Sequence, residues 1–379
     1  MTEWSRLVRD SLVGVAPYDP GPSLTELRER YGLDEIVKLN WNEGLLGPFP
    51  GVGEAVVAEL ERAWMYPEQA FSDFREALAA GIGTSPTNIV PGHGIQALIV
   101  TVAHAFLEPG DTVVVPVPTY GLYAQVCAAA GARVERVPGR DHRHDFEAVA
   151  AAAHRTDARL VWLCDPNNPT GSLGDRAEWE FLLEALPERC AVVVDEAYVE
   201  FVEPKRRLLR EEDAEAGRPV LLLRTFSKIF GLAGLRLGYA LAHESLASCL
   251  DVVQEPFNVN RAALAAGRVS LGRLDLVEER RRANAGARAV LADGLRAAGA
   301  EVFPSEANFV LADVGVDDLA FAERLLRRGI LIRPGSEFGL AGHVRITVGP
   351  PALMERVAAE VAQAREELLA RAAHSSAAR

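Results

Sequence analysis

The middle of the chain alternates short runs of aliphatic and β-branched residues with longer segments whose apolar residues recur every three or four positions. Short apolar runs are typical of strands buried on both faces, and the longer segments are typical of amphipathic helices. Strands are expected at residues 112–115, 133–137, 160–164, 192–194, 220–223 and 237–242. Helices are expected at residues 98–107, 120–130, 146–153 and 179–186. This alternation predicts an α/β fold with a mainly parallel sheet covered by helices.

The pattern changes at both ends of this region, and a length of 379 residues favours two domains. Residues 1–50 contain PYDPGP and LLGPFPG, which are too irregular for a sheet core, so we expect an arm and an entry to a small domain. After Asn258 the chain becomes rich in Ala, Arg and Glu, with its clearest helix at 271–298. Further strands are expected near residues 308–312, 330–333 and 344–348. We therefore predict a large domain at 51–255 and a smaller α+β domain at 256–379.

Charge and cysteine content exclude several classes of protein. Forty Lys and Arg residues against 53 Asp and Glu give a net charge of −13, which argues against a nucleic-acid partner. No segment approaches the roughly 18 uninterrupted apolar residues of a membrane span, and the first residues carry charges without an apolar run. Cys127, Cys164, Cys190 and Cys249 lie far apart and form no CxxC pair, so we expect reduced thiols. These features predict a cytoplasmic protein with no membrane partner.

Polar residues follow four of the predicted strands. They are Tyr120 after VVVPVPT, the DPNNPTG segment at 165–171 after LVWLC, Asp195 and Tyr198 in VVVDEAY, and Ser227 and Lys228 after LLLRTF. Ligands of parallel sheets bind beyond the carboxyl ends of the strands, so these residues should meet at one edge. A lysine for covalent attachment and a carboxylate for a ring nitrogen are what pyridoxal 5′-phosphate requires. The sequence therefore predicts a site for this cofactor.

Each residue of this expected site has a physical reason for its role. Asp195 would keep the ring nitrogen protonated, so that the ring can accept electrons when the substrate Cα loses its proton. Lys228 would move that proton between Cα and C4′. Asn168 and Tyr198 would hydrogen-bond the phenolate oxygen of the ring, and Tyr120 would lie against the ring face.

A second set of residues is expected to bind the phosphate of the cofactor. A helix N-terminus favours anions, and hydroxyl and guanidinium groups add donors. The expected ligands are Gly94, Ile95, Gln96, Thr225, Ser227 and Arg236.

Each of these residues taken singly has an ordinary structural explanation. An Asp after a strand is commonly a helix cap or part of a turn, and Lys228 alone is most simply a solvated surface charge. Their joint placement after successive strands favours the binding site. GLAGLRLG lacks the GxGxxG spacing of a nicotinamide site, and His142 and His144 have no further ligand cluster, so no metal is expected.

The ordered motifs PNNPTG, DEAYVEF, TFSKIFGLAGLRLGY, ANFV and RITVG resemble the fold-type I, class I and II aminotransferases, and within them the histidinol-phosphate aminotransferases. The resemblance extends from PYDPG at 17–21 to RITVG at 345–349. It implies an aspartate aminotransferase-like fold and a transferase of histidine biosynthesis that moves an amino group between histidinol phosphate and 2-oxoglutarate by a ping-pong route. An aromatic or other L-amino-acid aminotransferase, and a phosphothreonine-type decarboxylase that uses the same cofactor, stay open as alternatives.

The resemblance also implies roles for residues outside the strand ends. Tyr66 matches a tyrosine that reaches the cofactor phosphate of the neighbouring subunit, which implies a homodimer with shared active sites. Arg345 matches the arginine that binds the anionic end of the substrate. Tyr18, Asn42 and Arg333 are assigned to the same substrate site, with a surface salt bridge as the alternative for Arg333.

The chain departs from the family pattern at three places. It has NEGLLGP at 42–48 where NENPLGP is common, and GIQA at 94–97 where an Asp-Glu pair usually opens the phosphate-binding helix. Asp165 replaces the usual first Asn of NPNNPTG. All three places border the expected substrate pocket.

Overall fold

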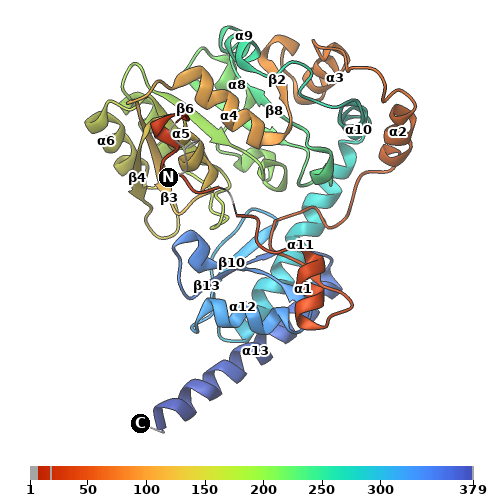
Figure 1. Cartoon of the computed structure of the whole chain (residues 1–379), viewed down its shortest axis with the longest axis vertical. Helices are drawn as coiled ribbons and strands as arrows, with labels where there is room; N and C mark the ends of the chain where they lie inside the picture. The colour runs from red at the N-terminus through yellow and green to blue at the C-terminus, as the bar shows by residue number, and fades with distance from the viewer. Residues whose placement is uncertain (1–6, 18, 378–379) are drawn as a thin grey trace.

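The structure is a computed structural model that describes residues 7–17 and 19–377. Tyr18, assigned above to the substrate site, lies outside the described residues. Figure 1 shows a large α/β part and a smaller part below it, with the long helix α11 (Asp275–Ala297) running from one to the other. None of the helices in the described ranges is both long and apolar enough to cross a bilayer.

The large part is built on a sheet that has seven strands in the described chain, in the order β2-β8-β7-β6-β5-β3-β4. Its strands are β2 (Ile89–Gly92), β3 (Thr112–Val117), β4 (Arg133–Pro138), β5 (Leu160–Cys164), β6 (Ala191–Asp195), β7 (Val220–Thr225) and β8 (Gly238–Leu241). The pairs from β7 through to β4 are parallel, whereas β8 runs antiparallel to both of its neighbours. The prediction of a mainly parallel sheet in an α/β fold is confirmed.

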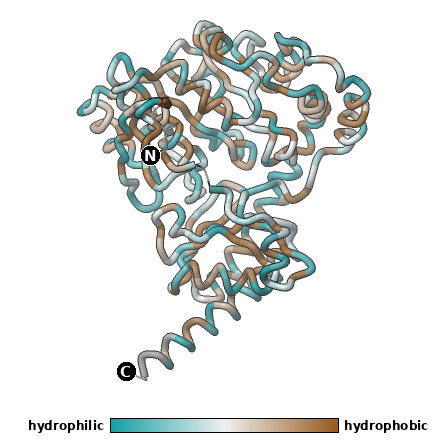
Figure 2. The backbone as a smooth tube through the Cα atoms, viewed as in Figure 1, coloured by the Kyte–Doolittle hydropathy of each residue, from teal (hydrophilic) through white to brown (hydrophobic). Residues whose placement is uncertain are grey.

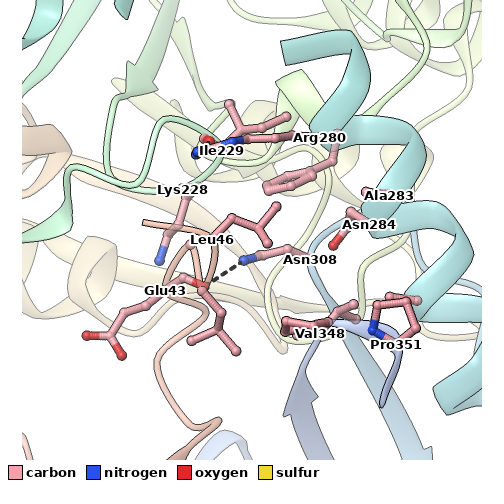
Figure 3. A pocket seen from close by; sticks show the side chains of 16 residues that line it. Glu43, Leu46, Lys228, Ile229, Arg280, Ala283, Asn284, Asn308, Val348 and Pro351 are labelled. Atoms are coloured by element: carbon pink, nitrogen blue, oxygen red, sulfur yellow. Dashed lines mark hydrogen bonds between the residues drawn. The ribbon is translucent and has the colours of Figure 1, made fainter. Parts of the chain in front are cut away.

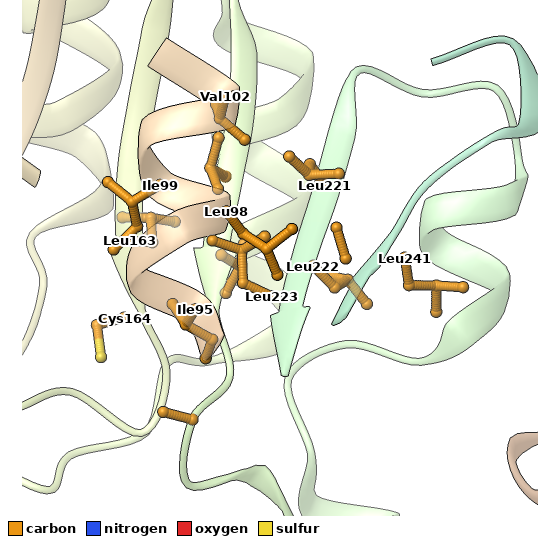
Figure 4. Packing of buried hydrophobic residues seen from close by; sticks show 14 of the residues in the cluster. Ile95, Leu98, Ile99, Val102, Leu163, Cys164, Leu221, Leu222, Leu223 and Leu241 are labelled. Atoms are coloured by element: carbon orange, nitrogen blue, oxygen red, sulfur yellow. The ribbon is translucent and has the colours of Figure 1, made fainter. Parts of the chain in front are cut away.

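Helices pack against the sheet and bury its strands on both faces. The helices of the large part are α2 (Val52–Leu60), α3 (Ser72–Ile82), α4 (Gly94–Phe106), α5 (Leu122–Ala129), α6 (Phe146–Thr156), α7 (Arg176–Ala185), α8 (Glu211–Glu215), α9 (Glu244–Val253) and α10 (Arg261–Leu271). Of these, α2 and α10 pack on each other, and α10 also packs on α3. Figure 4 shows α4 laying Leu98 and Val102 against Leu221 and its neighbours in β7. Every residue of β5, β6 and β7 is buried, which explains why these strands read as continuous apolar runs rather than alternating ones.

Short 3₁₀ helices occupy several of the connections. They are η2 (Asp10–Leu12), η3 (Pro86–Asn88), η4 (Val199–Phe201), η5 (Pro204–Arg206), η6 (Ala233–Leu235) and η7 (Gly335–Phe338). The sequence did not predict β2, because its four residues IVPG contain a proline and a glycine, both poor strand formers. The structure places β2 at the edge of the sheet, where a proline is tolerated.

The smaller part has its own sheets and its own core. Its elements are α1 (Leu24–Tyr31), β1 (Val37–Lys38), β9 (Glu301–Val302), β10 (Phe309–Asp313), α12 (Asp318–Leu326), β11 (Ile330–Leu331), β12 (Arg333–Pro334), β13 (His343–Thr347) and α13 (Pro351–Ala377). In the described chain one sheet is antiparallel with the order β12-β13-β10-β9, and β1 pairs in parallel with β11. Figure 2 shows hydrophobic residues along the central strands of this part. The N-terminal segment therefore contributes a strand to the small part.

The two parts have separate hydrophobic cores that α11 joins. Leu276 and Val277, near its start, pack on the core of the large part, and Leu291 and Leu295 lie in the core of the small part. Helix α10 packs against α2 and α3, so it belongs with the large core. The expected domain boundary near residue 256 stays a prediction.

Candidate active site

The polar residues predicted from the strand ends lie close together at one edge of the large sheet. Asp195 is the last residue of β6 and pairs in register with Cys164 at the end of β5. Asn168 lies in the loop after β5, and Lys228 lies three residues beyond the end of β7. Tyr120 follows β3 and precedes α5. The edge forms because parallel strands end side by side.

Lys228 is half-buried at the boundary between the two parts. Its Nζ donates a hydrogen bond to the backbone carbonyl of Trp41 at 3.0 Å. Burial and then the positive charge of Arg345 lower the pKa of the Lys228 amine to about 7, against the opposing charge of Glu43. A lysine needs its neutral form to act as a nucleophile, and a pKa near 7 makes that form abundant.

Asp195 is a buried carboxylate, 4% exposed, with two hydrogen-bond donors. The Tyr123 hydroxyl donates to Oδ2 at 2.6 Å, and the Ala197 backbone N–H donates to Oδ1 at 3.0 Å. Burial raises the pKa of Asp195 to about 6, and the hydrogen bonds from Tyr123 and Ala197 oppose that rise. A carboxylate has about four acceptor positions, so Asp195 can accept a further hydrogen bond from a cationic ligand.

Two side chains of the loops link the sheet edge to the small part. The Asn168 amide oxygen accepts a hydrogen bond from the Arg345 guanidinium. The Tyr198 hydroxyl accepts one from Asn42 Nδ2 at 3.0 Å, and its ring meets Phe309 edge-on. Burial raises the pKa of Tyr198, so its hydroxyl keeps its proton near neutral pH and can also donate.

Two arginines lie directly opposite each other in the antiparallel pair of β12 and β13. Arg345 is 4% exposed and lies over the ring of Phe338 at 5.0 Å. Arg333 is half-buried and forms an ion pair with Glu337, as the salt-bridge alternative for this residue expected. Side chains directly opposite in an antiparallel pair lie on the same face of the sheet. Both guanidinium groups lie over the ring of Phe338.

A group of donors surrounds the start of α4. Gly94 has a φ of +72°, and a Cβ there would lie 2.6 Å from the Arg236 guanidinium. Glycine at this position lets Arg236 approach the helix N-terminus, where it donates to Gln96 Oε1 at 3.1 Å. The hydroxyls of Thr225 and Ser227 lie 2.9 Å apart beside the same guanidinium, with Ser227 Oγ 3.5 Å from it.

The first turn of α4, with Ile95 and Gln96, has backbone N–H groups without partners inside the helix. Together with the guanidinium and the two hydroxyls, these N–H groups form a donor set that suits a phosphate dianion. With a nucleophilic lysine and a buried carboxylate at the same edge, the residues present fit pyridoxal 5′-phosphate.

Tyr120 and Tyr66 lie in different surroundings. The Tyr120 hydroxyl accepts a hydrogen bond from Gln96 Nε2 at 2.9 Å, so Tyr120 is part of the group around α4. Tyr66 is 78% exposed, stacks on Phe257 and accepts a hydrogen bond from Arg261 through its backbone carbonyl. These contacts of Tyr66 lie outside the group around Lys228.

A hollow lies beside Lys228, where the loop at 43–46, the start of α11 and residues 348–351 meet. Figure 3 shows Lys228 and Leu46 on one side of it and Val348 and Pro351 on the other, with Asn308 directed at the backbone of Glu43. On α11, Arg280 donates to the carbonyls of Gly47 at 2.7 Å and Ile229 at 2.8 Å. The loop that carries Lys228 is therefore tied to α11.

Sequence reasoning missed two residues that contact the site. Tyr123 donates a hydrogen bond to Asp195, and its signal was the sequence TYGLY, which places a second tyrosine three residues after Tyr120. Trp41 contacts Lys228 only through its backbone carbonyl, and a backbone contact has no residue-type signal.

Comparisons with known proteins agree with this site. The family model described as aminotransferase class I and II matches residues 34–361. A curated histidinol-phosphate aminotransferase of Geobacillus thermodenitrificans is 38% identical, covering 92% of this chain and 96% of the relative, and one of Symbiobacterium thermophilum is 39% identical, covering 91% and 94%. The crystal structure of histidinol-phosphate aminotransferase from Sinorhizobium meliloti in complex with pyridoxal-5′-phosphate has a TM-score of 0.88 and 33% identity, covering 95% of this chain and 98% of that one.

Proposed function

The chain belongs to the class I and II aminotransferases, and from that premise we propose that it transfers an amino group between histidinol phosphate and 2-oxoglutarate with pyridoxal 5′-phosphate as cofactor. The observation that carries the proposal is the placement of Lys228 and Asp195 at one sheet edge, next to a pair of opposed arginines. The names of the relatives support the choice of substrate.

In this proposal each side chain at the edge of the large sheet has a separate role toward the cofactor. When bound, the cofactor supplies a carrier for the amino group and a ring that accepts electrons. Lys228 would hold the cofactor and would act as the base for the proton at the substrate Cα. Asp195 would stabilise the protonated ring nitrogen, Asn168 and Tyr198 would hydrogen-bond the ring oxygen, and Tyr120 would cover one face.

The phosphate group of the cofactor binds at the start of α4 in this proposal. Arg236 and the hydroxyls of Thr225 and Ser227, which lie together beside the first turn of α4, would hold it with the backbone N–H groups of that turn. A helix N-terminus and a guanidinium stabilise the same dianion, so the donors reinforce each other.

Arg333 and Arg345 define the substrate in this proposal. A phosphate monoester carries close to two negative charges at neutral pH and matches two guanidinium groups, whereas the single charge of a carboxylate is balanced by one bidentate arginine. The opposed arginines therefore favour histidinol phosphate over an amino acid with one carboxylate. We assign Asn42 and Tyr18 to the same half of the site, and an L-amino-acid aminotransferase is the second candidate.

We propose further that the enzyme is a cytoplasmic homodimer in which Tyr66 reaches the active site of the partner subunit. Trp64 is 82% exposed, and Leu60 and Val57 beside it are also exposed, so this segment presents an apolar surface. Exposed apolar patches of this kind mark protein interfaces. The free cysteines are compatible with a reducing compartment.

A donor screen tests the proposed function. Purified protein with added cofactor is assayed for glutamate formation from 2-oxoglutarate, with histidinol phosphate, histidinol, phenylalanine or aspartate as the donor. We expect kcat/KM for histidinol phosphate to exceed that for the other donors by at least about 100-fold, since two arginines contact the phosphate. A preference for phenylalanine over histidinol phosphate would favour the second candidate, and release of carbon dioxide instead of glutamate would indicate a decarboxylase.

A further inference from the structure

Tyr123 contacts the carboxylate that the proposed function assigns to the ring nitrogen. Its side chain is fully buried, and its hydroxyl donates to Asp195 Oδ2 at 2.6 Å. That distance lies within the roughly 2.5–2.7 Å of hydrogen bonds between a hydroxyl and an ionised oxygen. Burial and the neighbouring charge of Asp195 raise the pKa of Tyr123 well above its ordinary value. The phenol therefore keeps its proton and acts as a donor.

The position of the Tyr123 hydroxyl is fixed by the packing of its ring. The ring stacks on Trp162 of β5, with centroids 5.1 Å apart and planes 8° apart. The rings of Tyr120 and Tyr123 meet edge-on, with centroids 5.5 Å apart. The tyrosine assigned to the ring face thus lies just before α5, and the tyrosine that contacts the carboxylate lies in the first turn of α5.

The groups around Asp195 act in opposite directions on its charge. Burial and the charge of Glu196 favour the neutral acid, whereas the donors Tyr123 and Ala197 N–H and the charge of Lys228 favour the carboxylate. Cys164 of β5 and Tyr198 also face Asp195. Both keep their protons, because burial raises the pKa of each. Among the described residues, Tyr123 provides the side-chain hydrogen bond to the carboxylate.

We propose that Tyr123 is a positioning residue of the reaction: its hydroxyl orients the Asp195 carboxylate and keeps it ionised, so that Asp195 holds the proton on the ring nitrogen of the cofactor. The inference rests on the proposed function. Tyr123 itself touches neither substrate nor cofactor in this role and acts through Asp195.

Tyr123→Phe tests the proposal, because it removes the hydroxyl and leaves the stacked ring. The acidic limb of the pH profile of kcat/KM reports the group that must be ionised in the free enzyme. We expect this limb to move upward by about one to two pH units, because that pKa shift corresponds to the free energy of a hydrogen bond to a buried charge. We also expect kcat at pH 7 to fall about tenfold with KM changed less than about twofold. A limb that stays in place would overturn the proposal.

Tyr239→Phe is the matched control, since Tyr239 is also buried in the large part and its hydroxyl faces Arg224 rather than Asp195. It should leave the acidic limb in place. An equal shift in both variants would show a general loss of packing and would contradict the role of Tyr123.

A second substitution keeps the test valid if Tyr123→Phe folds poorly. Site-specific incorporation of 3,5-difluorotyrosine at position 123 preserves the ring and makes the phenol a stronger donor. We expect the acidic limb to move downward, opposite to the shift in Tyr123→Phe. A limb unchanged by this substitution would overturn the proposal by itself.

A spectroscopic measurement separates this inference from the proposed function. The infrared carboxylate band of Asp195, assigned by difference from Asp195→Asn, should titrate at higher pH in Tyr123→Phe than in the native chain, with or without the cofactor. The native chain could bind cofactor and form glutamate while its carboxylate band titrates at the same pH as in Tyr123→Phe. That result would overturn the inference about Tyr123 and leave the proposed function standing. A native chain that binds no cofactor would overturn the proposed function, while the band would still test the contact between Tyr123 and Asp195.

Discussion

The two halves of the candidate site are built in different ways. The half at the edge of the large sheet, with Asp195 and Lys228, uses residues at the ends of adjacent strands. The half toward the small part depends on long-range contacts, such as Asn42 with Thr347, which are 305 positions apart in the chain. The first half is fixed by local sequence within a regular fold, whereas the second depends on how the two parts pack together. Substitutions should therefore affect chemistry in the first half and substrate choice in the second.

Replacing Lys228 with alanine should have the largest effect. We expect glutamate formation to fall at least about a thousandfold, because the chain loses the amine that anchors the cofactor and moves the proton. The thermal unfolding midpoint should change by only a few degrees. Lys205→Ala, at an exposed lysine, is the control and should keep full activity.

A labelling experiment checks the same residue without relying on rates. Lys38, Lys205 and Lys228 are the lysines of the sequence. Borohydride reduction of the holoenzyme followed by peptide mapping should place the cofactor on Lys228 alone. Label on either of the other two lysines would contradict the assignment.

Asp195→Asn should have the next largest effect. The amide cannot stabilise a positive charge on the ring nitrogen, so we expect kcat to fall by about 10² to 10³, the range for loss of one preorganised electrostatic contact. KM for the donor should change little, because the substrate half is intact. Steady-state kinetics at pH 7 make the measurement, and a loss smaller than about threefold would refute the role of Asp195.

Arg333→Gln should affect the second half selectively. We expect kcat/KM for histidinol phosphate to fall about 10- to 100-fold, the worth of charge-assisted hydrogen bonds to phosphate, with little change for histidinol. Arg327→Gln is the control. Arg327 forms an ion pair with Glu323, four residues away, as Arg333 does with Glu337, but the side chain of Arg327 is more exposed. Equal losses for both donors would favour the L-amino-acid alternative and weaken the distinction between the halves.

Asp165→Asn should have the smallest effect, on stability rather than chemistry. Burial raises the pKa of Asp165 in the folded chain to about 8, and its Oδ2 accepts from the Gly174 backbone N–H. The unfolded chain ionises Asp165 near pH 4, so the folded chain loses stability as the pH rises from about 4 to about 8. An amide has no such dependence.

Urea unfolding at pH 5.5 and pH 8 measures this difference. The free energy of unfolding of Asp165→Asn relative to the native chain should increase by about 1 to 2 kcal/mol between the two pH values, on the scale of a buried polar group. The reverse trend would show that Asp165 is ionised in the folded chain.

The difference between the halves also explains how much could be predicted from sequence. Strands such as Leu160–Cys164 could be predicted from their continuous apolar runs. Because parallel strands end side by side, Asp195 and Lys228 could then be placed at one edge of the sheet. The pairing of Arg333 with Arg345 could not be derived, because the register of β12 against β13 is a tertiary property. The contact of Tyr123 with Asp195 was missed because tyrosine at a helix start is ordinarily a packing residue.

Because β8 runs antiparallel to β7, two residues of the candidate site lie on one connecting loop. A strand parallel to β7 would need a crossover to the opposite edge of the sheet, whereas the antiparallel β8 begins at the same edge where β7 ends. Residues 226–237 therefore form one uninterrupted segment that includes both Lys228 and Arg236. The separation between Lys228 and Arg236 is set by a single loop, so, under the proposed function, an insertion or deletion there would change the length of cofactor that the protein can accommodate.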